Sequence, residues 1–109
     1  MDFSRYQGLA RTTAIYPNIG SNPYYPTLGL VGQAGEIANK VKKIMRDYDG
    51  VITPDMKTSV SKEIADLVWD CAAHASEFGL SLNPLAEENI AKLASRKERG
   101  VITGSGDER

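Results

Sequence analysis

Apolar and polar residues follow one another with the period of an α-helix over most of this chain. From residue 28 to residue 47 the apolar positions recur every three or four residues, at Leu30, Ala34, Ile37, Val41 and Ile44. This spacing places them on one side of a helix, which predicts a helix over about 27–47 with a core-facing stripe. The following Tyr48-Asp49-Gly50 is typical of a helix end.

Three more segments have helical patterning. They are residues 3–14, a stretch that starts at Thr53-Pro54 and ends before Gly79, and a stretch from 81–84 to Arg99 with Gly100 as its stop. Thr and Pro are favoured at the N-cap and first position of a helix, and Gly is favoured after its end. No segment shows the period-two alternation of a strand. The pattern predicts an all-α, antiparallel four-helix bundle.

Composition narrows the class of protein. The chain has 109 residues, 41% hydrophobic and 25% charged, with 13 basic and 14 acidic residues. This length supports one domain over 1–109, with about 101–109 as a glycine-rich tail. The near balance of charge does not favour a nucleic-acid polymer as partner. No apolar run approaches the ~20 residues that span a membrane, so we expect a cytoplasmic protein without membrane contact.

A polar edge beside the apolar stripe is the candidate for chemistry. Gln33, Glu36, Lys40 and Lys43 fall along one margin of the second helix, and Glu63, Asp66 and Asp70 fall along one margin of the third. If the stripes pack together, these carboxylates can face each other and would repel unless a cation neutralised them. Oxygen ligands suit Mg²⁺ or Mn²⁺ rather than zinc. The alternative is that acidic residues three apart form only a solvated helix face.

The order of these residues resembles a known family. LGLVGQAGEIANKVKK followed by KEIADLVWD is similar to the MazG-like all-α nucleotide pyrophosphohydrolases, which carry Glu-x-x-Glu on one helix and Glu-x-x-Asp on the next long helix. FSRYQ and TAIYP before this motif, and AEENIAKLASRKERG and GSGD after it, extend the resemblance over nearly the whole chain. The matching positions are Gln33, Glu36, Glu63 and Asp66.

The resemblance implies a Mg²⁺-dependent enzyme, with Mn²⁺ as a possible substitute, that hydrolyses (deoxy)nucleoside triphosphates to monophosphate and pyrophosphate and clears unwanted nucleotides. It implies Glu36, Glu63 and Asp66 as catalytic metal ligands. Asp70 stands where many relatives have an aromatic residue; we assign Gln33 and Asp70 as outer or weaker ligands, and Asp70 also as a candidate contact to the substrate. It also implies a homodimer or homotetramer. The residues that it suggests as contacts to the nucleotide or its phosphates are Asn89, Lys92 and Arg96, with Lys40 and Lys43 as weaker candidates.

Two of these assignments have an alternative. Basic residues in the last turn of the fourth helix also complement the helix dipole, which is sufficient reason for Arg96 to be there. Trp69 points away from the predicted stripe, so it either forms part of a subunit interface or offers a surface on which a base stacks.

Gln33 departs from the family pattern, which has glutamate there. Its amide can offer a neutral oxygen to a metal but contributes no charge. Three functions therefore remain open: a pyrophosphohydrolase, a nucleotide-binding or structural helical dimer that lost turnover through Gln33, and a helical interaction module without a small-molecule site.

Overall fold

A computed structural model describes all residues from 1 to 109 and contains four helices and no strand. They are α1 (Phe3–Arg11), α2 (Tyr24–Tyr48), α3 (Pro54–Glu77) and α4 (Leu82–Glu98). The predicted all-α class is confirmed. None of the helices combines the length and apolar character that a bilayer-crossing segment needs.

Local signals set most of the helix ends. Thr53 caps α3 by accepting a hydrogen bond from the Met56 N–H at 3.3 Å, as the Thr-Pro pair predicted. Asp49 and Gly50 end α2 in left-handed conformations, with φ of 52° and 75°. Gly100 adopts a φ of 71° just after α4. Such values favour glycine because a Cβ is strained there.

Two helix boundaries differ from the predicted ones. α1 ends at Arg11 rather than residue 14, because the hydroxyl groups of Thr12 and Thr13 donate to carbonyls three residues back, at 2.6 and 2.7 Å. This local bonding competes with continuation of a helix. α2 starts at Tyr24, three residues earlier than expected. Its first turn tolerates Pro26, since that position needs no backbone donor.

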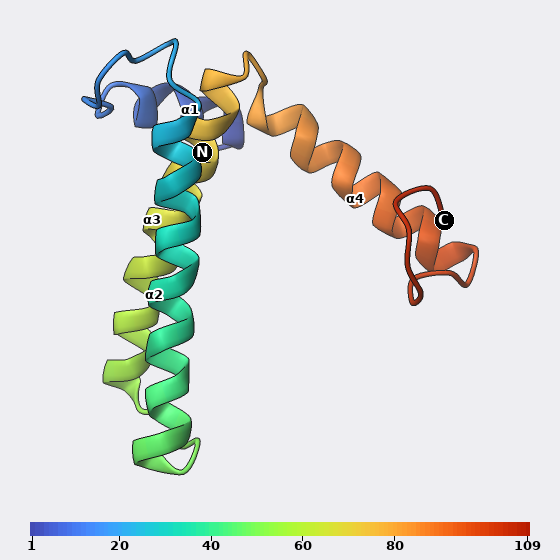
Figure 1. The fold of residues 1–109 in the computed structure, drawn as a ribbon. Coiled ribbons are helices and arrows are strands. Elements are labelled where there is room, and N and C mark those ends of the chain that lie inside the picture. The colour runs from blue at the N-terminus through green and yellow to red at the C-terminus, as the bar shows by residue number, and fades with distance from the viewer.

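The long helices α2 and α3 form a hairpin, and α1 packs across the end of the hairpin where α2 begins and α3 finishes (Figure 1). Small residues of α1 and α3 allow close approach there: Ala10, Ala72, Ala73 and Ala75 are all buried. Four of the nine buried residues of the chain therefore lie at this junction.

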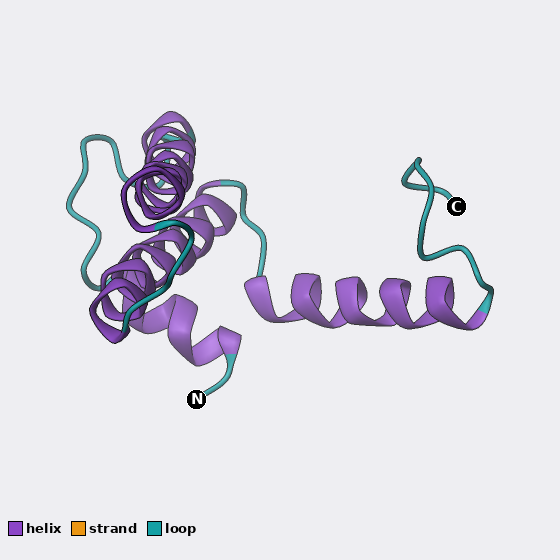
Figure 2. Cartoon of the chain, turned by 90° about the horizontal axis from the view of Figure 1, so that it is seen from below, coloured by secondary structure: helices purple, strands orange, loops and turns teal.

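α4 leaves the hairpin at a steep angle and extends away from it, as Figures 1 and 2 show from two directions. Its direction is set at its first residue by Gln7 of α1, whose Oε1 accepts from Leu82 N at 2.7 Å. The Gln7 Nε2 donates to Leu80 O at 2.9 Å. α4 has no contact with α2, and it touches α1 and α3 only near its start. One chain therefore does not close into a four-helix bundle.

The open shape leaves apolar surface uncovered. Of the predicted stripe on α2, only Ile44 is buried, and Val41 is 45% exposed. The Cα radius of gyration is 16.9 Å, whereas a compact domain of this length has about 13 Å. A stripe that is amphipathic in sequence but half exposed in the chain indicates a surface meant to be covered.

Candidate functional site

A cavity of about 610 Å³ lies at the junction of the hairpin with the loop that follows α1. Its walls combine aromatic rings with oxygen-bearing side chains: Tyr16, Tyr25, Trp69, Gln33, Asp66 and Asp70. The loop, α2 and α3 all contribute. Cavities of this size, mostly apolar with a few polar groups, are typical of small-molecule sites.

The loop wall of the cavity is fixed by one carboxylate. Glu77, whose side chain is inaccessible to solvent, accepts hydrogen bonds from the Tyr16 hydroxyl, from Gly20 N at 2.9 Å and from Asn22 N at 3.0 Å. Arg11 completes the arrangement with an ion pair of 3.3 Å to Glu77. These contacts hold residues 12–23 against the end of α3.

The same contacts shift the acidity of Glu77. The hydrogen bond from Tyr16 is the largest influence, and the backbone donors and Arg11 add to it, so that the pKa of Glu77 falls to about 2 although burial opposes the shift. Donors to the charged form of an acid stabilise that form. Glu77 is therefore ionised over the whole physiological range.

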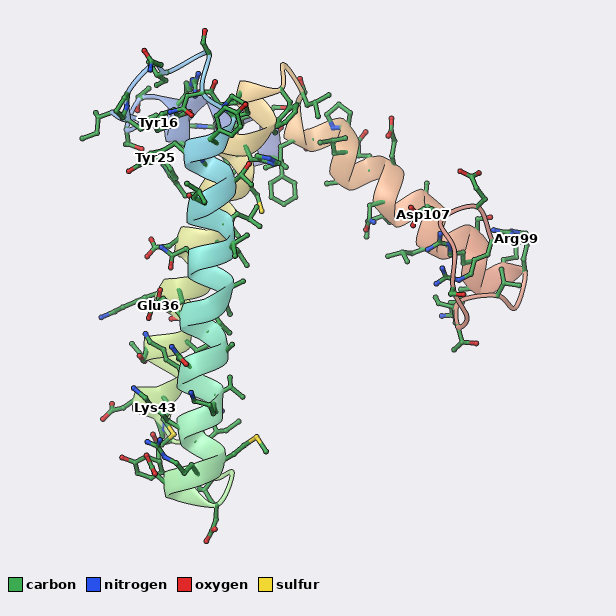
Figure 3. All side chains as sticks on the ribbon, viewed as in Figure 1. Tyr16, Tyr25, Glu36, Lys43, Arg99 and Asp107 are labelled. Atoms are coloured by element: carbon green, nitrogen blue, oxygen red, sulfur yellow. The ribbon has the colours of Figure 1, made fainter.

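Three aromatic side chains of the cavity are held by contacts with other residues. The rings of Tyr16 and Tyr25 stack with centroids 4.7 Å apart and an angle of 17°, and both lie at the top of the hairpin in Figure 3. Trp69 donates its Nε1–H to the Thr13 hydroxyl at 2.8 Å. Trp69 thus lines the cavity. Tyr25 remains 49% exposed and accessible from outside.

Asp70 is a largely buried acid in the wall of the cavity. It is only 6% exposed, and no donor of the chain makes a hydrogen bond to its carboxylate. Burial raises the pKa of Asp70, and the nearby charge of Asp66 adds to the effect. Gly29 of α2 permits this position, because a Cβ there would lie 2.5 Å from the Asp70 Oδ1.

Gln33 faces the same cavity from α2. Its Oε1 is buried and accepts no hydrogen bond. A buried acceptor without a donor is costly, by about 1–3 kcal/mol, so native structures usually satisfy it with water, an ion or a ligand. The carbonyl oxygen of Gln33 is thus a free acceptor next to the Asp66 and Asp70 wall.

The other predicted metal ligands lie further along the hairpin. Glu63 forms an ion pair with Lys40 across the two helices, with Nζ 2.7 Å from Oε1, and Lys40 also donates to Ser59 O at 3.1 Å. Glu36 is exposed and lies about halfway down α2, and Lys43 lies further down (Figure 3). At the rise of a helix, Tyr25 and Glu36 are about 16 Å apart along α2.

The acidic side chains do not converge on one point. No three His, Cys, Asp or Glu side chains are close enough together to hold an ion. The side-chain oxygens of Gln33, Asp66 and Glu63 are nevertheless the kind of ligand that a divalent cation such as Mg²⁺ prefers. Positive charge is favourable beside the Gln33 oxygen, which has no donor, and beside Glu63, where the Lys40 ammonium group already lies. The donor set thus fits Mg²⁺ in the kind of ligand atom, although the carboxylates are not gathered around one point in this chain.

The predicted phosphate contacts of α4 lie far from this cavity in the same chain. Asn89 and Lys92 are exposed on α4, which forms an arm that extends from the hairpin, and Arg96 near the end of this arm is buried. The guanidinium of Arg96 donates to main-chain oxygens of the tail, at 2.8 Å to Asp107 O and 3.4 Å to Arg109 O. The tail folds back onto the end of α4, as Asp107 and Arg99 show in Figure 3. Arg96 therefore organises the tail within one chain.

Sequence patterning missed Glu77, the carboxylate that holds the loop wall. Glu77 had a detectable signal, because an acid in the last turn of a helix opposes the helix dipole and is unfavourable without a compensating partner. Three tyrosines in a proline-rich loop were a second signal, since aromatic rings usually need packing partners. The role of Gly29 depends on the approach of α3 and has no signal in its own helix.

Comparison with known proteins shows the family of this chain. Residues 26–101 match the model of the MazG nucleotide pyrophosphohydrolase domain. The chain belongs to the MazG family. It is also 50% identical to the Gene 37 protein of Mycobacterium phage L5 over 109 aligned residues, which cover 95% of this chain and 96% of that protein. No solved structure matches it. The matched range of this MazG chain contains Gln33, Glu63, Asp66 and the α4 residues up to Arg96.

Proposed function

We propose that this MazG-family chain is a Mg²⁺-dependent nucleoside triphosphate pyrophosphohydrolase that releases monophosphate and pyrophosphate and removes unwanted nucleotides. The observation that carries the proposal is the single cavity in which fixed aromatic rings meet Asp66, Asp70 and the free oxygen of Gln33. Aromatic walls suit a base, and oxygen ligands suit the cation that accompanies a triphosphate.

The direction of the nucleotide follows from the order of groups along α3. Trp69 and Asp70 lie at the aromatic end, and Asp66 and Glu63 follow one and two turns away. We assign the base to the aromatic end and the phosphates to the acidic edge of the hairpin. Lys40 at that edge, and Lys43 one turn beyond it, are the nearest cations for phosphate oxygens.

The metal ligands of the proposal are Glu36, Glu63 and Asp66, with the oxygen of Gln33 as a neutral fourth ligand. A bound Mg²⁺ would neutralise charge on the triphosphate. The contribution of the chain is to hold these oxygens at the hairpin edge, where Lys40 lies beside Glu63 as the cation of the chain itself. The ion pair of 2.7 Å supports this exchange of one cation for another.

We also propose that the active form is a homodimer or homotetramer in which the hairpins and arms of different copies form the helical bundle. Only nine of 109 residues are buried in one chain, and large apolar side chains of α4 remain uncovered: Ile90 is 67% and Leu93 is 38% exposed. Exposed apolar surface of this extent is typical of subunit interfaces. In an assembly, the exposed Asn89 and Lys92 can reach the site of another copy, whereas Arg96 holds the tail of its own chain.

The proposal is tested by measuring pyrophosphate release from the four dNTPs and four NTPs with and without Mg²⁺. We expect Mg²⁺-dependent release that Glu63→Ala abolishes, because this change removes a charged metal ligand. Glu88→Gln, an exposed acid on α4 without a hydrogen bond, is the control and should keep full activity. Retained turnover in Glu63→Ala would show that the metal lies elsewhere.

A second candidate function is nucleotide binding without turnover, and Gln33 favours it. With glutamine there, the ligand set has one negative charge fewer than the Glu-x-x-Glu pattern provides. Nucleotide binding with no pyrophosphate release from any of the eight triphosphates would support this candidate and eliminate the enzyme. Absence of both nucleotide and metal binding would leave only a helical interaction module.

A further inference from the structure

Asp70 is an acceptor in the wall of the aromatic cavity to which the chain supplies no donor. The residue is only 6% exposed, its carboxylate oxygens are accessible from the cavity, and none of the hydrogen bonds of the chain reaches them. Two hydrogen bonds hold the surrounding walls, from Trp69 to Thr13 and from Tyr16 to Glu77, and neither involves Asp70. Buried carboxylates are normally paired or hydrogen-bonded. Its hydrogen-bond partner therefore comes from what occupies the cavity, which is water or a ligand that replaces the water.

The surroundings define what that ligand must offer. Tyr25 and Trp69 provide aromatic surface beside the carboxylate, which suits a flat heteroaromatic ring. An ionised carboxylate has two oxygens and accepts hydrogen bonds only. The ligand therefore needs a planar ring with neighbouring N–H donors on one edge.

Guanine meets this requirement better than the other bases. Its N1–H and 2-amino group are adjacent donors that match both oxygens of a carboxylate. Adenine and cytosine place a ring acceptor next to their amino group, and the N3–H of thymine or uracil lies between two carbonyl oxygens. Those acceptors would face the negative charge of Asp70 and be repelled.

We propose that Asp70 is the specificity-determining residue of the site and that it selects guanine nucleotides by accepting hydrogen bonds from N1–H and the 2-amino group of the base. The inference rests on the proposed function for the placement of the base, and it adds the substrate preference. Asp66, one turn away, remains with the phosphate and metal end of the site.

The packing of Asp70 supplies a matched pair of variants. In Gly29→Ala the new Cβ would lie 2.5 Å from Oδ1 of Asp70 and must displace the carboxylate. Gly32→Ala, one turn further along the same helix, meets no atom within 4 Å and is the control. Both changes raise helix propensity by a similar amount, so the difference between them reports the position of Asp70.

The first experiment compares kcat/KM for dGTP, dITP, dATP, dCTP and dTTP. We expect the wild type to prefer dGTP over dATP, dCTP and dTTP by about tenfold or more. Asp70→Asn and Gly29→Ala should remove this preference, and Gly32→Ala should keep it. An equal loss for all substrates in Asp70→Asn, together with a higher Mg²⁺ requirement, would make Asp70 a metal ligand and overturn the proposal.

The second experiment measures binding without Mg²⁺ and without turnover, using the fluorescence of Trp69, the only tryptophan of the chain. We expect dGMP to bind about tenfold more tightly than dIMP, which has the same N1–H but lacks the 2-amino group. Equal binding of the two would overturn the proposal. If dGMP is preferred but no triphosphate is hydrolysed, the proposed activity fails and the assignment of Asp70 stands.

Discussion

The ammonium nitrogen of Lys40 lies 2.7 Å from Oε1 of Glu63, so an internal cation neutralises a carboxylate that the family pattern assigns to metal. Both side chains are largely shielded from solvent, with 30% and 18% of their surfaces exposed. A divalent ion that binds Glu63 must therefore compete with Lys40 or draw Glu63 away from it.

Replacing Lys40 should strengthen metal binding. In Lys40→Met the side chain keeps its length but loses the charge that competes for Glu63. We expect the dissociation constant for Mn²⁺, measured by electron paramagnetic resonance, to fall about threefold. Lys42→Met removes a neighbouring lysine that has no ion pair and should leave it unchanged. Weaker Mn²⁺ binding in Lys40→Met would mean that Lys40 instead supports the metal-binding arrangement.

Restoring glutamate at position 33 tests whether this position lies next to the metal ion. In Gln33→Glu a third carboxyl group joins the wall formed by Asp66 and Asp70, where like charges repel. We expect a lower melting temperature than wild type without metal, and a larger increase than wild type on addition of Mg²⁺. Metal affinity should increase about tenfold, since affinity follows the charge of the ligand set. A melting temperature that responds to Mg²⁺ as in wild type would place residue 33 away from the ion.

Glu77 should make the stability of the loop wall depend on acid pH. Its pKa falls from an ordinary 4.5 to about 2 on folding, so the unfolded chain binds the proton more readily. The stabilisation is fully present above pH 4.5 and is lost as the pH falls toward 2. Glu77→Gln should lower the melting temperature by several degrees at pH 7, and the difference should shrink as the pH approaches 2. A constant difference between pH 7 and pH 2 would contradict this account, and Glu88→Gln serves as the control.

Local rules were sufficient for the four helices but not for their arrangement. The Thr53-Pro54 start and the Gly50 and Gly100 stops act within a few residues, so patterning finds them. The direction of α4 depends on Gln7, 75 residues before Leu82 in the chain. A contact between residues so far apart in the chain leaves no periodic pattern in the sequence. The helical pattern therefore predicted a closed bundle, whereas one chain forms an open hairpin from which α4 extends.

The candidate site, too, was predictable from the sequence only in part. The edge that carries Gln33, Asp66 and Asp70 follows from helical spacing, and the structure brings these three residues to one cavity. The ion pair of Lys40 with Glu63 and the closeness of Gly29 to Asp70 depend on how α2 and α3 are aligned along each other. Spacing within one helix contains no information on that alignment, so sequence could name the participants but not their partners.

The apolar surface of α4 should control assembly. Ile90 is 67% exposed and lies, with Ala86 and Ala94, in an apolar depression along the arm. In Ile90→Glu a charge would be buried at any interface that covers this surface, which costs several kcal/mol. We expect light scattering coupled to size-exclusion chromatography to give a dimer or tetramer for wild type and a monomer for Ile90→Glu. Glu88→Lys, which changes the charge of α4 by two at an exposed position, should retain the wild-type mass. A monomeric wild type would refute the assembly proposal, because no interface would then exist for Ile90→Glu to disrupt.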